Sequence, residues 1–467
     1  MKIKSIISIL LLCAMLFTAA GCSDDGDSSE ENVKIVLESD NFVFTDDMAL
    51  YMFAYTRMML DAEFSTYGVD DTKPLSEQMR TDDESFADYL YRMTLENIKK
   101  ITLYCEAASK DEYVITEGLL YKANESISYL GQVASDVGMS IEEYITELYG
   151  DGVTREGLET CTQMMTLCEG YEISLKDSHK VSETDISAYA GKHGDDFRKF
   201  DALRFTTVNK VLAEQLAAAT SAEEFLKIMD SVSGYDLTDS DKNDIPDFLE
   251  VNDAVVSTDT AGEFASRDGA AAGDTVITEK DGFYIVTLLL NTPAMDSAPT
   301  WDYRMVYITT ESSTDPYSDA SSLRDQWIEK KGGEEGFANI ASRYSDHPTA
   351  YYGGLISGAK KDELPESVAT WLTADDRKEG DSTMAPGGDD AAFIIYYKSG
   401  NTPRWKYEVT DAIKSEYALD TVDKMKSDIE KGFDLDEELL HQMFDKYQKQ
   451  VIASYTANMI VDTPEST

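Results

Sequence analysis

The chain has 467 residues, of which 42% are hydrophobic, so it is long enough for roughly two to four domains with apolar cores. Its 89 acidic side chains outnumber 41 basic ones, and the formal net charge is −48. This charge argues against nucleic acid or an anionic membrane surface as a partner, because both attract positively charged surfaces. It fits a soluble, self-repelling protein outside the cytoplasm, and the alternative is that it favours basic binding partners.

The first 33 residues predict export rather than a folded domain. Lys2 and Lys4 precede an apolar run at residues 6–17 that is short for a membrane span, and small residues then lead to Cys22. This pattern resembles a bacterial lipoprotein signal, with residues 1–21 as the signal peptide and Cys22 as the lipidated first residue. The alternative is an ordinary secretory signal with an incidental cysteine.

Residues 22–33 are polar and acidic, which predicts a disordered tether. No later run is apolar enough to cross a bilayer. We therefore expect the protein to be extracytoplasmic and lipid-anchored to the bacterial cell membrane through Cys22.

Residues 34–197 predict a helical domain, with a short strand at residues 33–37 and Thr45 as the N-cap of the first helix. Apolar residues recur on one face of that helix at Met48, Tyr51, Met52, Tyr55 and Met59. This spacing predicts a core face, and the alternative is an exposed methionine-rich binding groove. Capping-box patterns at residues 140–143 and 182–185 open two further helices.

Three cysteines remain after Cys22 in the chain. Cys161 and Cys168 lie two turns apart on one predicted helix, which is too far for a disulfide between them. We expect both, together with Cys105, to be core residues without a redox or metal role. The four histidines are too scattered for a metal cluster, and no cofactor is expected.

The second half of the chain contains an internal repeat. Residues 200–207 parallel residues 301–310, and the Asn-Thr-Pro ending at residues 291–293 returns at residues 401–403. Each copy reads strand, long helix, loop, short helix and strand. The strands are rich in β-branched and aromatic residues, which predicts an antiparallel sheet covered by helices.

The pattern predicts an α+β fold with the two copies at residues 198–296 and 299–403. After the second copy, residues 404–467 return to helical periodicity through about Tyr455. This last segment predicts a C-terminal helix.

One loop of the second copy carries the most specific motif. The run Tyr-Ser-Asp-His-Pro-Thr-Ala-Tyr-Tyr-Gly-Gly at residues 344–354 resembles the signature loop of parvulin-type peptidyl-prolyl isomerases. The segments at residues 138–154 and 181–189 resemble the helical chaperone domain and the linker helix of the SurA and PrsA foldases. The resemblance implies a SurA-like N-terminal chaperone domain, a degenerate parvulin-like first copy, a parvulin-like second copy, and a C-terminal helix that packs on the N-terminal domain.

The resemblance also implies which residues would act on an X-Pro peptide bond. Isomerisation faces a barrier of about 18–20 kcal/mol from amide resonance, and it needs an apolar pocket for the proline and a polar group near the carbonyl. The catalytic positions fall on Asp346 and His347. The substrate-binding positions fall on Leu364, Val368, Trp371, Leu372, Phe393 and Val306. The last two replace the two histidines of the family.

These replacements leave two functions open. In the first, the protein is a foldase that binds exported unfolded proteins and also catalyses cis-trans isomerisation of X-Pro bonds, so the enzyme class would be peptidyl-prolyl isomerase. In the second, it is a holdase chaperone with two inactive parvulin-like domains. Ser345 and Asp346 would then cap a helix or brace the loop.

An acidic loop in the first copy has calcium-loop spacing. Oxygen-bearing side chains occupy positions 1, 3, 5, 9 and 12, namely Asp239, Asp241, Asn243, Asp247 and Glu250. In a chain this acidic, the alternative is a solvated loop.

Overall fold

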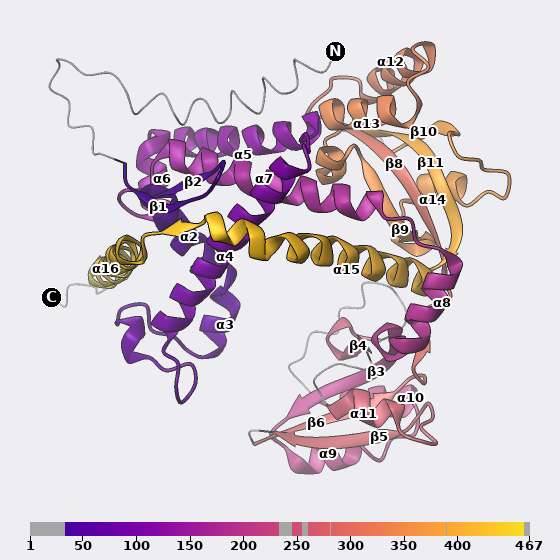
Figure 1. Cartoon of the computed structure of the whole chain (residues 1–467). Helices are drawn as coiled ribbons and strands as arrows, with labels where there is room; N and C mark the ends of the chain where they lie inside the picture. Colours follow the sequence, from indigo (N-terminus) through magenta and orange to yellow (C-terminus); the bar gives the residue numbers. More distant parts are fainter. Residues whose placement is uncertain (1–32, 233–244, 255–259, 281, 389, 462–467) are drawn as a thin grey trace, which may run out of the picture. The chain divides into compact units, whose positions relative to one another are not determined.

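The computed structural model describes residues 33–232, 245–254, 260–280, 282–388 and 390–461. It has an α+β fold, as predicted, with three antiparallel sheets and long helices (Figure 1). The chain forms two compact units. Unit 1 combines residues 1–179, 338–354 and 416–467, and unit 2 combines residues 180–337 and 355–415. The division of the chain into six segments, from the signal peptide to the C-terminal helix, remains a prediction.

Unit 1 is mainly helical and carries a small sheet with the strand order β12-β1-β2. Its strands are β1 (Ile35–Glu38), β2 (Val43–Thr45) and β12 (Asp434–Leu435). Its helices in the N-terminal half are α2 (Asp46–Met59), α3 (Asp61–Thr66), η2 (Leu75–Glu77), α4 (Phe86–Lys110), α5 (Glu117–Asp136), α6 (Ile141–Tyr149) and α7 (Arg155–Ser178). The later segments add η5 (Pro348–Tyr352), η7 (Glu430–Gly432) and α16 (Glu437–Val461).

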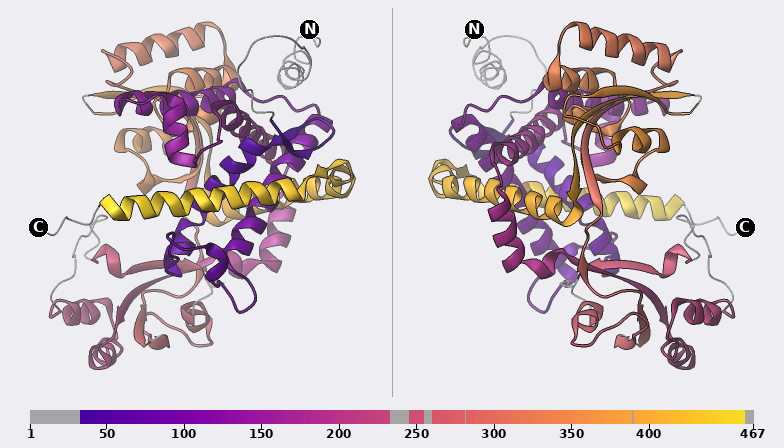
Figure 2. Two further views of the ribbon diagram at one scale, coloured as in Figure 1. Left: turned by 90° about the vertical axis from the view of Figure 1, so that its left-hand side faces the viewer. Right: turned by 90° about the vertical axis from the view of Figure 1, so that its right-hand side faces the viewer.

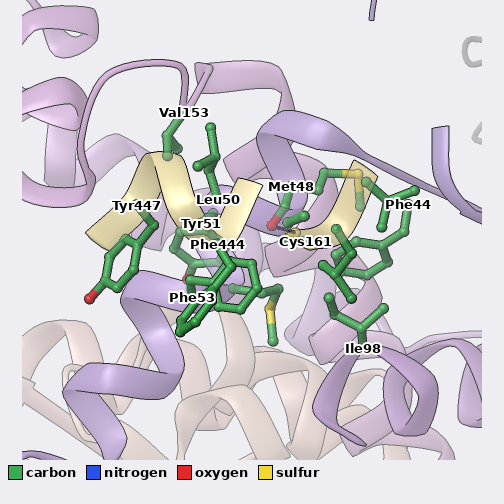
Figure 3. Packing of buried hydrophobic residues seen from close by; sticks show 14 of the residues in the cluster. Phe44, Met48, Leu50, Tyr51, Phe53, Ile98, Val153, Cys161, Phe444 and Tyr447 are labelled. Carbon is green, nitrogen blue, oxygen red and sulfur yellow. Dashed lines mark hydrogen bonds between the residues drawn. The ribbon is translucent and has the colours of Figure 1, made fainter. Parts of the chain in front are cut away.

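Both ends of the chain contribute to the core of unit 1. Strand β12 pairs with β1, with Leu435 opposite Leu37. Residues of α16, drawn in yellow in Figure 2, share a hydrophobic cluster with residues of α2, α4 and α7. Figure 3 shows Phe444 and Tyr447 beside Phe53, with ring centroids 5.0 and 6.0 Å from that of Phe53. The C-terminal helix therefore completes a core that the N-terminal helices begin.

The helix capping and the apolar face of α2 follow from local sequence. Met48, Tyr51 and Met52 are buried, which confirms the core interpretation for most of this face, whereas Met59 at its end is 63% exposed. Complete capping boxes open α6 at Ser140 and α8 (Glu183–Lys192) at Ser182. Thr45 is the N-cap of α2 but makes no side-chain capping bond. Its hydroxyl instead donates to Asp47 Oδ1.

The first copy, in unit 2, forms a sheet with the strand order β4-β3-β6-β5, and β7 also pairs with β3. Its elements after α8 are η3 (Gly194–Phe197), β3 (Arg198–Thr207), α9 (Lys210–Leu216), α10 (Ala222–Met229), η4 (Asp247–Leu249), β4 (Glu250–Ala254), α11 (Thr260–Ser266), β5 (Thr275–Lys280), β6 (Phe283–Leu289) and β7 (Ala294–Met295). One face of β3 packs on α9 and α10, and the other face packs on α11.

The second copy has the sheet order β10-β11-β8-β9. Its elements are β8 (Pro299–Thr309), α12 (Pro316–Glu329), α13 (Gly333–Tyr344), β9 (Leu355–Lys360), η6 (Lys361–Glu363), α14 (Glu366–Leu372), β10 (Ser382–Pro386) and β11 (Ala391–Pro403), followed by α15 (Arg404–Ile429). Read from β9, this order is β9-β8-β11-β10, which matches β4-β3-β6-β5. The predicted repeat is therefore confirmed at the level of strand order.

Helices cover both faces of the second sheet. Val368 and Leu372 of α14 share a cluster with Tyr303 of β8 and Ile395 of β11. On the opposite face, the ring of Tyr396 lies 5.9 Å from Trp327 of α12 and 5.4 Å from Phe337 of α13. Successive residues of a strand point to opposite faces, so β11 divides its side chains between these two helical layers.

Candidate functional site

An open groove with a volume of about 530 Å³ lies beside α14 in the second copy. It is lined by Pro365, Glu366, Ser367, Thr370, Pro386, Gly387, Gly388 and Phe393. The start of α14 forms one side, and the end of β10 with its turn forms the other. The Ser367 hydroxyl donates to the Pro386 carbonyl at 2.8 Å, which ties the two sides together.

Among the described residues, Phe393 is the one aromatic residue that lines the groove, and it is 7% exposed. In the register of β11 and β8 it lies opposite Tyr307, and the two rings stack with centroids 4.8 Å apart. Beneath the groove, Val368 and Leu372 are fully buried. They therefore support the groove and are not exposed to a ligand in this state.

The turn after β10 is shaped by close approach of the backbone to Phe393. A Cβ added at Gly387 would lie 2.9 Å from the Cβ of Ala391 and 3.2 Å from Cε2 of Phe393. The Gly387 amide also donates to the Ala391 carbonyl at 2.9 Å. Glycine at this position allows the turn to approach the aromatic ring, and a larger side chain would push against it.

Leu364 and Trp371 are partly buried and pack against the same cluster as Phe393. The Arg377 guanidinium lies 4.6 Å from the centroid of the Trp371 ring, and its Nε donates to the Trp371 carbonyl at 3.1 Å. A cation over the ring face stabilises this arrangement and leaves less of the indole for a ligand. Four predicted residues, these two with Val368 and Leu372, therefore gather around Phe393.

Val306 lies apart from that group. It is fully buried on β8, but the cluster around Phe393 takes Tyr303, Met305 and Tyr307 from this strand, and alternation turns Val306 to the other face. The structure therefore does not bring Val306 together with the other predicted substrate-binding residues.

The predicted catalytic pair belongs to unit 1. Asp346 is exposed in the loop before η5, and His347 is the N-cap of η5. The Nδ1 atom of His347 accepts from the Thr349 amide at 3.3 Å and lies 2.9 Å from Thr349 Oγ1. Burial lowers the pKa of His347 below its usual value. The imidazole is thus a neutral cap that stabilises the first turn of η5.

Two tyrosines of the same loop hydrogen-bond to residues of α5 and α7 and so hold the loop against these helices. The sequence did not indicate this role. Tyr352 hydrogen-bonds to Glu169 through its hydroxyl and accepts from Lys122 Nζ at 3.0 Å. Lys122 also forms an ion pair with Glu169 at 2.9 Å. The Tyr351 hydroxyl donates to Glu125 at 2.7 Å, and burial, followed by Glu125, raises the pKa of Tyr351 to about 12.

The two glycines that end the loop explain why it can turn back after the tyrosines. Gly353 and Gly354 have φ angles of 65° and 71°, in the left-handed region that suits glycine. Their amides donate to the carbonyls of Ala350 and Thr349 at 2.9 and 2.8 Å. The Gly-Gly pair is therefore accounted for by the geometry of the loop.

We expect Tyr352→Phe to loosen this loop. The change removes a partly buried hydroxyl shared by Lys122 and Glu169, with a cost of about 1 kcal/mol. Hydrogen exchange of a peptide covering residues 344–354 should be several-fold faster than in the parent protein. Tyr344→Phe, at an exposed tyrosine of the same loop, is the matched control and should leave exchange unchanged. Equal exchange in the two variants would contradict the fastening role.

Several predicted sites lie wholly or partly outside the described residues. Cys22 is one of these, as are Asp239, Asp241 and Asn243 of the calcium hypothesis. Of the remaining two, Asp247 begins η4 and Glu250 begins β4. Within the described part of the chain, no group of three or more His, Cys, Asp or Glu side chains is placed to hold a metal ion. In the same part, no helix is both long and apolar enough to cross a membrane.

Comparisons with known proteins give structural matches only. No family model and no curated protein matches this chain. The structure of PrsA from Bacillus subtilis is 13% identical, with a TM-score of 0.21 over 81% of this chain and 93% of that one. PrsA from Bacillus anthracis is 10% identical, with a TM-score of 0.19 over 76% and 96%. The foldase protein PrsA from Streptococcus pneumoniae is 14% identical, with a TM-score of 0.25 over 47% and 79%.

The chain is thus similar to solved structures of the kind that its sequence motifs resemble.

Proposed function

We propose that this protein is an extracytoplasmic foldase, lipid-anchored through Cys22, that binds exported unfolded polypeptides in the groove beside α14. The observation that carries the proposal is the groove whose lining combines Pro365 and Pro386 with the largely buried ring of Phe393. Apolar residues beside the polar side chains of Ser367 and Thr370 suit an extended segment that contains apolar residues or proline. The net charge of −48 would favour basic clients.

The residues around the groove favour holding a client over isomerising its X-Pro bonds. Catalysis needs a polar group that stabilises the twisted amide better than the planar one. The two strand positions at which parvulins have histidines hold Val306 and Phe393, and His347 is engaged as a helix cap. We therefore favour the holdase hypothesis. The isomerase hypothesis is the second candidate, because the parvulin-like loop at residues 344–354 is present.

Binding in the groove is tested by Thr370→Arg. Thr370 is exposed and lines the groove, so an arginine there would fill the space without disturbing the core. We expect the Kd for a labelled, proline-containing unstructured peptide to rise about tenfold or more, which corresponds to at least about 1.4 kcal/mol. Fluorescence anisotropy measures this change.

The matched control for this variant is Thr314→Arg, which adds the same side chain at an exposed position of the second copy that does not line the groove. It should leave the Kd unchanged. Similar weakening in both variants would point to nonspecific charge repulsion, and no weakening in either would place client binding elsewhere.

An NMR exchange experiment on a proline peptide distinguishes the holdase hypothesis from the isomerase hypothesis. The holdase hypothesis predicts that the parent protein does not accelerate cis-trans exchange and that its exchange rate equals that of Asp346→Ala within error. It also predicts that both proteins suppress aggregation of an unfolded client. An acceleration that the Asp346→Ala variant loses would establish the isomerase. Failure to suppress aggregation would remove the foldase assignment altogether.

A further inference from the structure

Two cysteines of unit 1 face each other across a helix pair. Cys105 lies on α4 and Cys168 on α7, and their Sγ atoms are 3.7 Å apart. Each thiol also lies near a carbonyl one turn before the other cysteine. Cys105 Sγ is 3.6 Å from the Met164 carbonyl oxygen, and Cys168 Sγ is 3.3 Å from that of Ile101. The two side chains therefore point toward the same place between the helices.

The third cysteine of the described chain lies elsewhere. Cys161 is on the same helix as Cys168, seven residues earlier, which separates them by about 10 Å along the axis at 1.5 Å per residue. Its Sγ is 4.0 Å from the Met48 carbonyl oxygen of α2. Figure 3 shows it within the core beside Met48. The geometry thus selects one pair out of the three cysteines.

We propose that Cys105 and Cys168 form a disulfide that joins α4 to α7 when the protein meets an oxidant of the small-disulfide class. The sulfurs must close from 3.7 Å to about 2.05 Å, a movement shared by two side chains and two helices. The bond would close a loop of 63 sequence positions, from 105 to 168, and stabilise the fold by restricting the unfolded chain.

The exposure of the two thiols determines which of them reacts first with the oxidant. Cys168 is partly exposed, so its thiolate attacks one sulfur of the oxidant RSSR and releases RS⁻, leaving a mixed disulfide. Cys105 is fully buried, and after losing its proton it attacks Cys168 Sγ and expels the second RS⁻. The two cysteines lose two electrons and two protons, and RSSR becomes two RSH.

The second of these steps should be the slow one. Burial, and after it the neighbouring Cys168 thiol, raises the pKa of Cys105, so little thiolate is present at neutral pH. An oxidising compartment outside the cytoplasm, with no thiol pool to reverse the reaction, would let the bond accumulate. The disulfide does not depend on the client-binding function of the groove.

The test uses the chain from Ser23 onward, which keeps Cys105, Cys161 and Cys168 as its cysteines. After exposure to oxidised glutathione, we expect a mass lower by two hydrogens than that of the reduced protein. A non-reducing peptide map should join the Cys105 and Cys168 peptides, and only Cys161 should be alkylated after denaturation. The melting temperature should rise by several degrees and return on addition of dithiothreitol.

Two variants test which cysteines form the link. Cys161→Ala should keep the internal link, and Cys105→Ala should lose it and retain glutathione on Cys168. A parent protein with three alkylatable thiols, a link that includes Cys161, or a bond between two chains would each overturn the proposal. The peptide map of the parent protein decides the matter even if a variant does not fold.

Discussion

Glu106→Leu is expected to destabilise unit 1 by about 2 to 3 kcal/mol, because it removes the buried acceptor of three hydrogen bonds from Ser39 and Asn41. Glu106 lies on α4 and is 1% exposed. Its carboxylate accepts from the Ser39 hydroxyl at 2.7 Å, and from the backbone amide and the side-chain amide of Asn41 at 2.6 and 2.7 Å. Leucine fills similar space but leaves these donors without this acceptor, in a turn that joins β1 to β2.

Urea unfolding of the mature chain, followed by circular dichroism, measures this loss. Glu106→Gln should cost less, about 1 to 2 kcal/mol, because the amide keeps one acceptor oxygen. Glu96→Leu, on the exposed side of the same helix, should change stability by no more than about 0.5 kcal/mol. If the Glu106 and Glu96 variants unfold at the same urea concentration, the turn is not held by the buried carboxylate.

Phe444→Ala should cost about 3 to 5 kcal/mol, because it opens a cavity in a closely packed core. Phe444 of α16 is buried against Phe53 of α2 and Tyr91 of α4, with ring centroids 5.0 and 5.6 Å apart. The residue lies late in the chain, yet its partners belong to the first two long helices. Loss of its ring should therefore destabilise the N-terminal helices.

The control for this variant is Tyr455→Ala, an aromatic residue on the same helix that is 49% exposed. It should leave the unfolding midpoint nearly unchanged. Hydrogen exchange offers a second readout, since Phe444→Ala should speed exchange in α2 as well as in α16. A variant with faster exchange confined to α16 would show that the C-terminal helix is an appendage and not part of the core.

Local patterns in the sequence were enough to predict the duplicated domain. The order of strand-like and helix-like segments and the Asn-Thr-Pro ending recur along the chain, and the two copies share strand order in the structure. The capping boxes at Ser140 and Ser182 were also readable, since both partners lie within four residues of each other.

The site itself was only partly predictable. The positions around Phe393 came from the family resemblance, and the structure gathers Leu364, Val368, Trp371 and Leu372 near it. Val306 was assigned to the same pocket because alignment of a motif does not specify which face of a strand the residue occupies.

Contacts between residues far apart in sequence could not be predicted. The pairing of Cys105 with Cys168 depends on how α4 crosses α7, and comparison of cysteines within one helix could not reveal it. The fastening of Tyr352 to Glu169 has the same origin, because the two residues are separated by 183 positions.

The α+β class, the repeat and the helix starts could be inferred from the sequence alone, because these depend on interactions within a few residues or on the period of apolar side chains. The contacts between buried groups became visible in the folded chain. It places Glu106 under the β1–β2 turn, Phe444 beside Phe53, and His347 as a cap. Contacts of this kind depend on how helices and sheets pack around a shared core, and no local sequence pattern identifies the partner across that core.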